Sequence, residues 1–216
     1  MRQDLSQQVC TFEAIGGGGL ELAKLLPVDA NGDYVGDGAI NIQFKTPLGA
    51  LDHSYAYYGE NEYDDNCPAG WYNEKAEEIV TDFVFDPFEG FQVYASSPCN
   101  FTYAGAVNMA ETDVPFGKDI SMHGNIRPTT TDIQSIIPVN ENGEYIGDGA
   151  VNIQFASSLG YLQVAYAYYG KDEYDDNKPA GWYNEKTDEL ADYTFKAAEG
   201  FKIYATEAGY LRFPEM

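Results

Sequence analysis

Two short acidic segments hold the densest sets of metal-ligating side chains in the chain, and their spacing is the same. Each reads EYDDN, once from Glu62 to Asn66 and again from Glu173 to Asn177. Hard cations such as Ca²⁺ bind six to eight oxygen atoms, and clustered carboxylates beside an Asn carbonyl supply several of them. We expect either a solvated acidic loop or a calcium site. The candidate ligands are Glu62, Asp64, Asp65, Glu173, Asp175 and Asp176.

A third acidic stretch resembles a calcium loop only superficially. Asp29 to Asp33 reads DANGD, and its counterpart, Asn140 to Glu144, reads NENGE and has lost the first carboxylate. An Asn-Gly pair between two strand-like runs is a strong signal for a tight hairpin. A turn therefore explains both versions without a metal, and calcium is the only cofactor we consider.

Aromatic side chains form a second repeated set. Exposed rings beside carboxylates and amides can stack on sugars, and Tyr and Trp also suit protein interfaces because they combine a large area with a polar tip. The third interpretation is that these residues simply favour half-buried strands. All three stay open. The residues are Tyr55, Tyr57, Tyr58, Trp71, Tyr72, Tyr166, Tyr168, Tyr169, Trp182 and Tyr183.

Catalytic motifs are missing from the sequence. There is no GxSxG elbow, P-loop, HExxH or dinucleotide fingerprint, and the glycine run from Gly16 to Gly19 is better interpreted as a flexible loop. Neither histidine is duplicated, since His53 aligns with Val164 and His123 with Phe12. We therefore expect a protein that is not an enzyme.

Three cysteines, Cys10, Cys67 and Cys99, cannot all pair with one another. Their spacing is not that of a zinc site, and only two histidines could complete one. We expect reduced, structural thiols, with one disulfide and one free thiol as the alternative.

The elements that position these residues come in two copies. The segment 27–75 matches 138–186 at 34 of 49 positions, an offset of 111 residues, and the offset becomes 110 after Lys75. Upstream, Val9–Thr11 aligns with Ile120–Met122. We expect two domains, 1–105 and 106–216, joined near Ala104 to Val107. Residues 1–26 diverge most from their counterpart, so we expect an anchor there.

The hydrophobic pattern is that of β-structure throughout. Ile40, Ile42 and Phe44 alternate with polar residues, and residues 149–155 repeat the pattern. Further strands are expected at 54–58, 91–94, 165–169 and 201–204, and only 20–26 and 131–137 look helical, for one or two turns. The fold class is all-β: two tandem, duplicated antiparallel β-sandwich or barrel-like domains with very little helix.

Charge and composition exclude several partners. The 216 residues carry 12 Lys and Arg against 35 Asp and Glu, a net charge of -23, so we expect no nucleic acid and no anionic membrane as partner. The aromatic content of 15% argues against disorder. No apolar stretch is long enough for a membrane span, and the first eight residues lack the apolar core of a secretory signal.

The motif order resembles that of a known class of proteins. PV(D/N)xNG is followed by GDGxxNIQF, a Tyr-rich strand, GWY and a closing (E/A)EGFx(V/I)YA strand. This order is similar to tandem β-domain repeats of bacteriophage virions, such as capsid decoration and head-fibre proteins, and of bacterial cell surfaces. The resemblance implies a structural protein on a virion surface, made in the host cytoplasm, with other structural proteins of the same assembly as partners and a trimer as the expected homo-oligomer.

Two alternatives remain open beside the virion structural protein. The first is a bivalent carbohydrate-binding or adhesive module that uses the aromatic platforms around Trp71 and Trp182 to bind a host-surface glycan. The second is a calcium-stabilised extracellular domain. Both would place the protein outside the cell or on its surface.

Overall fold

The structure is a computed structural model that describes residues 4–9, 20–45, 51–85, 88, 90–96, 98–101, 109–156 and 161–216. Half of the residues lie in strands, and no helix in these ranges reaches seven residues, which confirms the all-β prediction. Among the described residues, helical structure is limited to two 3₁₀ turns, η1 (Leu22–Lys24) and η2 (Ile133–Ser135), which lie inside the two segments expected to be briefly helical. No helix in the described part is long and apolar enough to cross a membrane.

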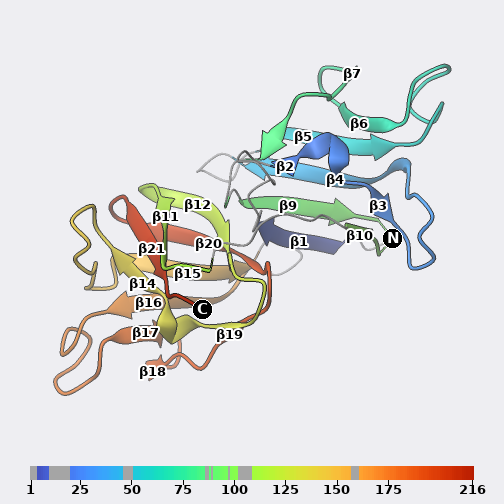
Figure 1. Ribbon diagram of the computed structural model, residues 1–216. Coiled ribbons are helices and arrows are strands. Elements are labelled where there is room, and N and C mark those ends of the chain that lie inside the picture. Colours follow the sequence, from blue (N-terminus) through green and yellow to red (C-terminus); the bar gives the residue numbers. More distant parts are fainter. Residues whose placement is uncertain are drawn as a thin grey trace.

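Each half of the chain forms one six-stranded antiparallel sheet, with the same strand order (Figure 1). The first sheet runs in the order β1 (Asp4–Val9), β9 (Gly90–Ala95), β4 (Asp37–Lys45), β5 (Leu51–Tyr58), β6 (Gly70–Asn73) and β7 (Glu78–Ile79). The second runs β12 (Asp119–Gly124), β20 (Gly200–Ala205), β15 (Val151–Ala156), β16 (Leu162–Tyr169), β17 (Gly181–Asn184) and β18 (Glu189–Leu190).

Short strands and the 3₁₀ turns cover one face of each large sheet. In the first repeat β2 (Leu20–Glu21) pairs with β8 (Val84–Phe85), and β3 (Pro27–Val28) pairs with β10 (Asn100–Phe101). In the second repeat β13 (Thr131–Asp132) pairs with β19 (Thr194–Phe195), while β21 (Gly209–Phe213) lies between β11 (Thr112–Phe116) and β14 (Ile137–Val139). Each repeat is therefore sandwich-like, and its described strands form open sheets.

The hydrophobic core of each repeat lies between these two layers. Ile40, Ile42 and Phe44 are buried there as their alternation predicts, and they contact Leu22 and Leu25 from the covering layer. Each core centres on a tryptophan that joins the layers. The indole N–H of Trp71 donates to the carbonyl of Leu25 at 2.8 Å, and that of Trp182 donates to the carbonyl of Ile136 at 2.7 Å.

Strand pairing corrects two details of the sequence alignment. The offset of 111 persists beyond Lys75, because the Val80 amide bonds to the Trp71 carbonyl as the Ala191 amide bonds to the Trp182 carbonyl. It is 110 by Phe83, whose carbonyl accepts from Leu22 as that of Tyr193 accepts from Ile133. The single deletion therefore lies between residues 80 and 83.

The N-terminal edge strands align differently from the sequence-based prediction. Asp4 pairs with Ala95 and Asp119 pairs with Ala205, so β1 and β12 correspond at an offset of 115. The alignment of Val9–Thr11 with Ile120–Met122 was wrong, because little identity remained there to fix the register. His123 consequently corresponds to Gln8 and still has no histidine counterpart.

The expected anchor and domain junction are only partly described. Within residues 1–26, β1 forms the edge of the first sheet, and Leu22 and Leu25 belong to the first core, so these parts are built into the first repeat. The remainder of that segment, including Cys10 and the glycine run, and the junction 104–107 lie outside the described residues.

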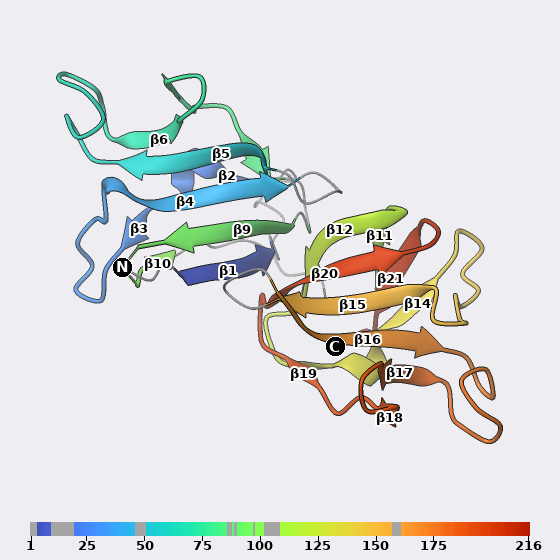
Figure 2. The same cartoon turned by 180° about the vertical axis from the view of Figure 1, so that it is seen from behind.

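The two repeats contact each other where β1 and β9 of the first sheet meet β12 and β20 of the second. A Cβ atom added at Gly90 would lie 2.5 Å from the carbonyl carbon of Met122, so only glycine fits at this crossing. Phe88, two residues before the start of β9, packs against the hydrophobic core of the second repeat. In Figures 1 and 2 the far edges of the two sheets, at β7 and β18, consequently lie at opposite ends of the molecule.

Candidate functional site: two outer tyrosine clusters

The aromatic residues selected from the sequence do not form exposed platforms. Trp71 and Trp182 are 1% and 0% exposed, and only Tyr58 and Tyr169 among the ten are more than marginally accessible. The alternative of exposed platforms around Trp71 and Trp182, one of the three interpretations left open, is therefore not met by these two residues. These positions follow the third interpretation, in which Tyr and Trp occupy buried strand positions. The buried members are Tyr55, Tyr57, Trp71, Tyr72, Tyr166, Tyr168, Trp182 and Tyr183.

Strand alternation divides the set between the two faces of each sheet. Tyr57 on β5 pairs with Trp71 on β6, and both side chains enter the core. Their neighbours Tyr58 and Tyr72 point to the opposite, outer face, because successive strand residues alternate. The loop that follows β5 brings Tyr63 onto this outer face. We call Tyr58, Tyr63 and Tyr72 the first outer tyrosine cluster.

The rings of this cluster contact one another closely. Tyr63 stacks on Tyr72 with 4.3 Å between ring centroids and 15° between ring planes. Tyr58 meets both rings edge-on, at 5.0 Å from Tyr63 and 5.8 Å from Tyr72. The Tyr72 hydroxyl donates to the Pro68 carbonyl at 2.7 Å. Tyr72 is thus buried beneath Tyr63, and Tyr58 and Tyr63 remain half-buried at the surface.

The second repeat contains the same arrangement, in Tyr169, Tyr174 and Tyr183, the second outer tyrosine cluster. Tyr174 stacks on Tyr183 with centroids 4.6 Å apart and ring planes inclined by 12°. Here an ammonium group is added. The Nζ atom of Lys178 lies 4.6 Å from the centroid of Tyr174 and 5.6 Å from that of Tyr183. The Tyr174 hydroxyl donates to Asp188 at 2.5 Å.

The first carboxylate of each acidic loop binds backbone amides beside the cluster. Glu173 Oε2 accepts the amide of Gly170 at 2.6 Å and the amide of Asp148 at 2.8 Å, and the Tyr145 hydroxyl donates to Oε1 at 3.3 Å. In the first repeat Glu62 accepts the amide of Gly59 at 3.1 Å.

Glycines in the GDG motif make room for these contacts. A Cβ atom at Gly147 would collide with the Glu173 carboxylate, and one at Gly36 would lie 2.8 Å from the Gly59 nitrogen. Gly38 has a φ of +73°, and a Cβ atom there would lie 2.6 Å from the Tyr58 hydroxyl. The two copies of GDGA are therefore explained by close packing of the loops after β5 and β16.

The expected calcium ligands do not converge in the structure. Glu62 and Glu173 bind backbone amides, and Asp64 Oδ1 accepts the amide of Asp65 at 2.8 Å. Among the described residues, no group of three or more His, Cys, Asp or Glu side chains is placed to hold a metal ion. The expected ligands Asp175 and Asp176 lie exposed in the same loop. The geometry thus favours a structural role for Glu62 and Glu173.

The DANGD segment is a tight turn, as its Asn-Gly pair predicts. The Asp29 carboxylate accepts the amides of Asn31 at 2.7 Å and Asp33 at 3.0 Å, and these bonds lower the pKa of Asp29. In the second copy the amide oxygen of Asn140 accepts the amides of Asn142 and Glu144. The neutral side chain of Asn140 thus accepts the same two amide hydrogen bonds as the Asp29 carboxylate, so the turn needs no cation.

The electrostatics of the clusters keep their hydroxyl groups protonated. Burial raises the pKa of Tyr72 and of Tyr183. Burial together with the nearby charge of Glu74 raises the pKa of Tyr58. The hydrogen bond to Asp188 raises the pKa of Tyr174 to about 12. The clusters therefore offer ring faces and hydroxyl donors at neutral pH, and their hydroxyls are poor nucleophiles and poor bases.

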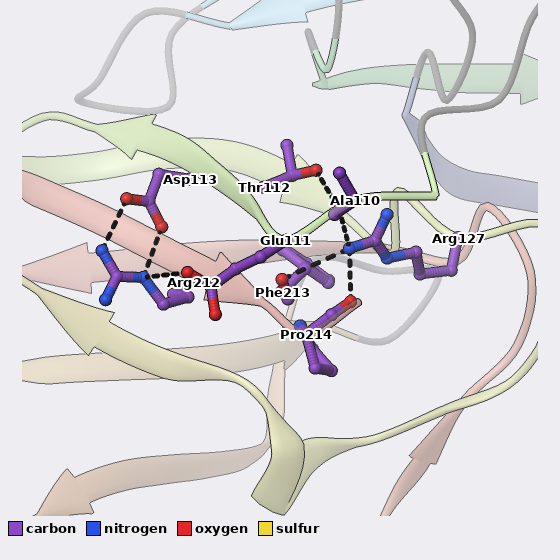
Figure 3. A network of polar contacts seen from close by, with 8 residues as sticks. All are labelled: Ala110, Glu111, Thr112, Asp113, Arg127, Arg212, Phe213 and Pro214. Atoms are coloured by element: carbon purple, nitrogen blue, oxygen red, sulfur yellow. Dashed lines mark hydrogen bonds and ion pairs between the residues drawn. The ribbon is translucent and has the colours of Figure 1, made fainter. Parts of the chain in front are cut away.

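A second polar network, which the sequence did not suggest, closes the end of the second repeat (Figure 3). Arg127 is 1% exposed, and its Nη2 atom donates to the carbonyls of Ala110 at 2.9 Å, Phe213 at 3.2 Å and Pro214 at 2.5 Å. Arg212 binds both carboxylate oxygens of Asp113 at 2.8 Å. The one sequence feature that could have drawn attention to these two residues is that arginine is scarce, with three in the chain.

The described cysteines are thiols. Cys67 and Cys99 are both free, and Cys10 lies outside the described residues. Burial raises the pKa of Cys99. Cys67 occupies the position of Lys178 in the first acidic loop, beside the stacked tyrosines.

Fold and site together define a tandem β-sandwich-like protein that carries one outer tyrosine cluster on each repeat. Comparison of the chain with protein-family models, with curated proteins and with solved structures gave no match.

Proposed function

We propose that this chain is a non-enzymatic structural protein, exposed on a bacteriophage particle, that presents two equivalent faces to neighbouring proteins. The observation that carries the proposal is that the two repeats share a surface as well as a hydrophobic core. The acidic loops repeat even their left-handed residues, with φ of 61° at Asn61 and 62° at Asp172, and 69° at Asn66 and 71° at Asn177. A core alone does not require two surface loops to keep one conformation.

The placement of the clusters supports a bridging role. The loops between β5 and β6 and between β16 and β17 lie at opposite ends of the molecule in both views (Figures 1 and 2). Two equivalent faces directed apart suit a subunit that links two similar positions in an assembly. A net charge of -23 would keep a crowded particle surface soluble, because particles that expose this protein repel one another.

Light scattering on the purified full chain tests this proposal. We expect a discrete trimer or larger ring, whose mass does not change when Ca²⁺ is added or chelated. A strict monomer at high concentration would overturn the assembly role and favour the bivalent binding module. A mass that rises only with Ca²⁺ would favour the calcium-stabilised extracellular domain instead.

A carbohydrate-binding or adhesive module is the second candidate, and it now depends on the outer tyrosine clusters. Tyr63 and Tyr174 are half-buried rings at the surface beside carboxylates, whereas the tryptophans are buried. A glycan screen with the double variant Tyr63→Ser and Tyr174→Ser tests it, with Tyr34→Ser as the matched control because Tyr34 is exposed outside the clusters. Loss of glycan binding in the double variant alone would support this candidate, and equal binding would exclude it.

A further inference from the structure

The two outer tyrosine clusters differ at one position that faces the stacked rings. The second cluster has Lys178, whose ammonium group lies within 5.6 Å of both stacked ring centroids. The first cluster has Cys67 at the same place, and a thiol carries no positive charge at neutral pH. Within the described part of the chain, Lys178 provides the only ammonium group found over a tyrosine ring.

The backbone around this position is the same in both copies. The Cys67 amide donates to the Asp64 carbonyl at 3.2 Å, and the Lys178 amide donates to the Asp175 carbonyl at 3.1 Å. The carbonyl of Cys67 accepts from Asn61 at 2.9 Å, and that of Lys178 accepts from Asp172 at 3.0 Å. Side chains at 67 and 178 therefore leave the loop at equivalent points. The second cluster shows, within the same molecule, which chemical group this arrangement accommodates.

The first cluster, like the second, has acidic residues around it. Burial raises the pKa of Tyr63, and the neighbouring Glu77, Glu74, Cys67 and Asp64 raise it further. The stacked rings add their own attraction, because the face of an aromatic ring is negative and draws an ammonium group within about 6 Å. In the second cluster the same attraction is met by Lys178, which also lies 3.4 Å from the Asp188 carbonyl.

We propose that the first outer tyrosine cluster is a binding site for a lysine side chain of a basic partner protein, which takes the place that Lys178 occupies in the second cluster. This inference deepens the proposed function, since it names what one of the two faces binds. At this cluster the net charge of -23 favours a basic protein over a second copy of the same acidic chain. Cys67, whose side chain interacts with Tyr72, brings no ammonium group to the first cluster, while Lys178 supplies one to the second.

A titration followed by NMR tests the site directly. The full chain, labelled with ¹³C in its tyrosine rings and kept reduced, is titrated with N-acetyl-lysine N-methylamide. The neutral isostere N-acetyl-norleucine N-methylamide is the control ligand. We expect saturable shifts of the Tyr63 and Tyr72 ring signals with the lysine compound alone, at millimolar concentration. The Tyr174 and Tyr183 signals should stay unchanged, because Lys178 already lies beside them.

Exchanging the two residues provides matched variants. Cys67→Lys should supply the ammonium group internally and weaken binding at the first cluster by about fivefold or more. Lys178→Cys should open the second cluster, so that the Tyr174 and Tyr183 signals begin to shift. No response of Tyr63 in the parent chain would overturn the proposal, as would equal responses to both ligands. If one variant fails to fold, the other still decides whether residue 67 or 178 controls binding.

Failure here is distinguishable from failure of the proposed function. The titration reports on a single side-chain site in the isolated chain, whereas light scattering reports on assembly. An assembling protein whose Tyr63 ignores the lysine compound would keep its structural role and lose this site. A monomer whose Tyr63 responds would keep the site and lose the virion role.

Discussion

The carboxylate of Glu173 joins two loops that are distant in sequence. It accepts the amides of Gly170 and Asp148 and the hydroxyl of Tyr145, whereas its counterpart Glu62 accepts the single amide of Gly59. Hydrogen bonding to the charged form lowers the pKa of Glu173. The first glutamate of the EYDDN motif therefore accepts more hydrogen bonds in the second repeat than in the first.

Replacing these glutamates should affect the repeats unequally. We expect Glu173→Ala to lower the free energy of unfolding by about 1 kcal/mol, a small value because the carboxylate is exposed to solvent. Glu62→Ala should lower it by less. Urea denaturation measures both variants against the parent chain. Equal losses would contradict the view that the additional Asp148 and Tyr145 contacts matter.

His123 is a buried neutral imidazole in the edge strand of the second sheet. Its Nε2 atom lies 2.8 Å from the Ser121 hydroxyl, and burial lowers the pKa of His123 to about 4. An unfolded histidine titrates near 6.5. Between these values the unfolded chain binds the extra proton, so the neutral histidine contributes stability above pH 6.5 that is lost as the pH falls toward 4.

The variant His123→Gln should remove this pH dependence. Gln is the residue that the first repeat has at the equivalent position 8. We expect the parent chain to lose up to about 3 kcal/mol between pH 6.5 and 4 from this group, and the variant to show a flatter profile there. Denaturation at a series of pH values measures the slope. Parallel profiles for the two proteins would show that His123 does not titrate in this window.

At the scale of elements, η2 braces its sheet more firmly than η1. The Gln134 side-chain amide donates to the carbonyls of Trp182 and Ala191 at 3.0 and 2.8 Å, and its oxygen accepts the Trp182 amide at 3.0 Å. The equivalent residue in η1 is Ala23, whose side chain can make none of these bonds. The second repeat thus ties its covering layer to β17 through one glutamine.

Gln134→Ala should selectively destabilise the second repeat. We expect a loss of about 1–3 kcal/mol, because three part-buried hydrogen bonds lose their partner. Hydrogen exchange of the β17 and β18 amides localises the effect. The reverse change in the first repeat, Ala23→Gln, is the matched control. Unaltered exchange in β17 would refute the bracing role.

The strands themselves could largely be predicted from the sequence. Which face of the sheet each tyrosine occupies could not. Alternation of Ile40, Ile42 and Phe44 fixed the strand and its buried side, because an apolar face must be covered. Tyr57 and Tyr58 are both tyrosine, so residue type could not show that one enters the core and the other the outer cluster. Tyr63 was missed because the EYDDN motif that contains it was interpreted only as a set of carboxylate ligands. Nothing in the sequence of β1 indicated that it corresponds to β12 at an offset of 115.

At the scale of the whole molecule, the contact between the repeats includes one especially close approach. Gly90 allows the start of β9 to lie against the Met122 backbone, and Phe88 reaches the second core from a left-handed conformation with φ of +68°. The equivalent residue, Ala198, keeps the conformation, with φ of +55°, but has a smaller side chain. The first repeat thus supplies the large side chain, Phe88, to the contact between the repeats.

Gly90→Ala should separate the unfolding of the two repeats. The added methyl group would meet Met122 backbone atoms that cannot move aside cheaply, so we expect calorimetry to show two transitions or a broadened one. Gly117→Ala is the control, because its methyl group meets nothing within 4 Å. A single sharp transition in both variants would mean that the repeats are coupled elsewhere.

The near-identity of the two copies also has a consequence during folding. Residues 27–75 and 138–186 share 34 of 49 positions, so a strand such as β5 finds almost the same partners in either repeat. Tandem copies on one chain are prone to inter-domain misassembly for this reason. The edge strands β1 and β12 differ in sequence, whereas their partners β9 and β20 are closely similar. Of these four strands only β1 and β12 therefore distinguish the two sheets, so correct closure of each repeat on itself would depend on that edge.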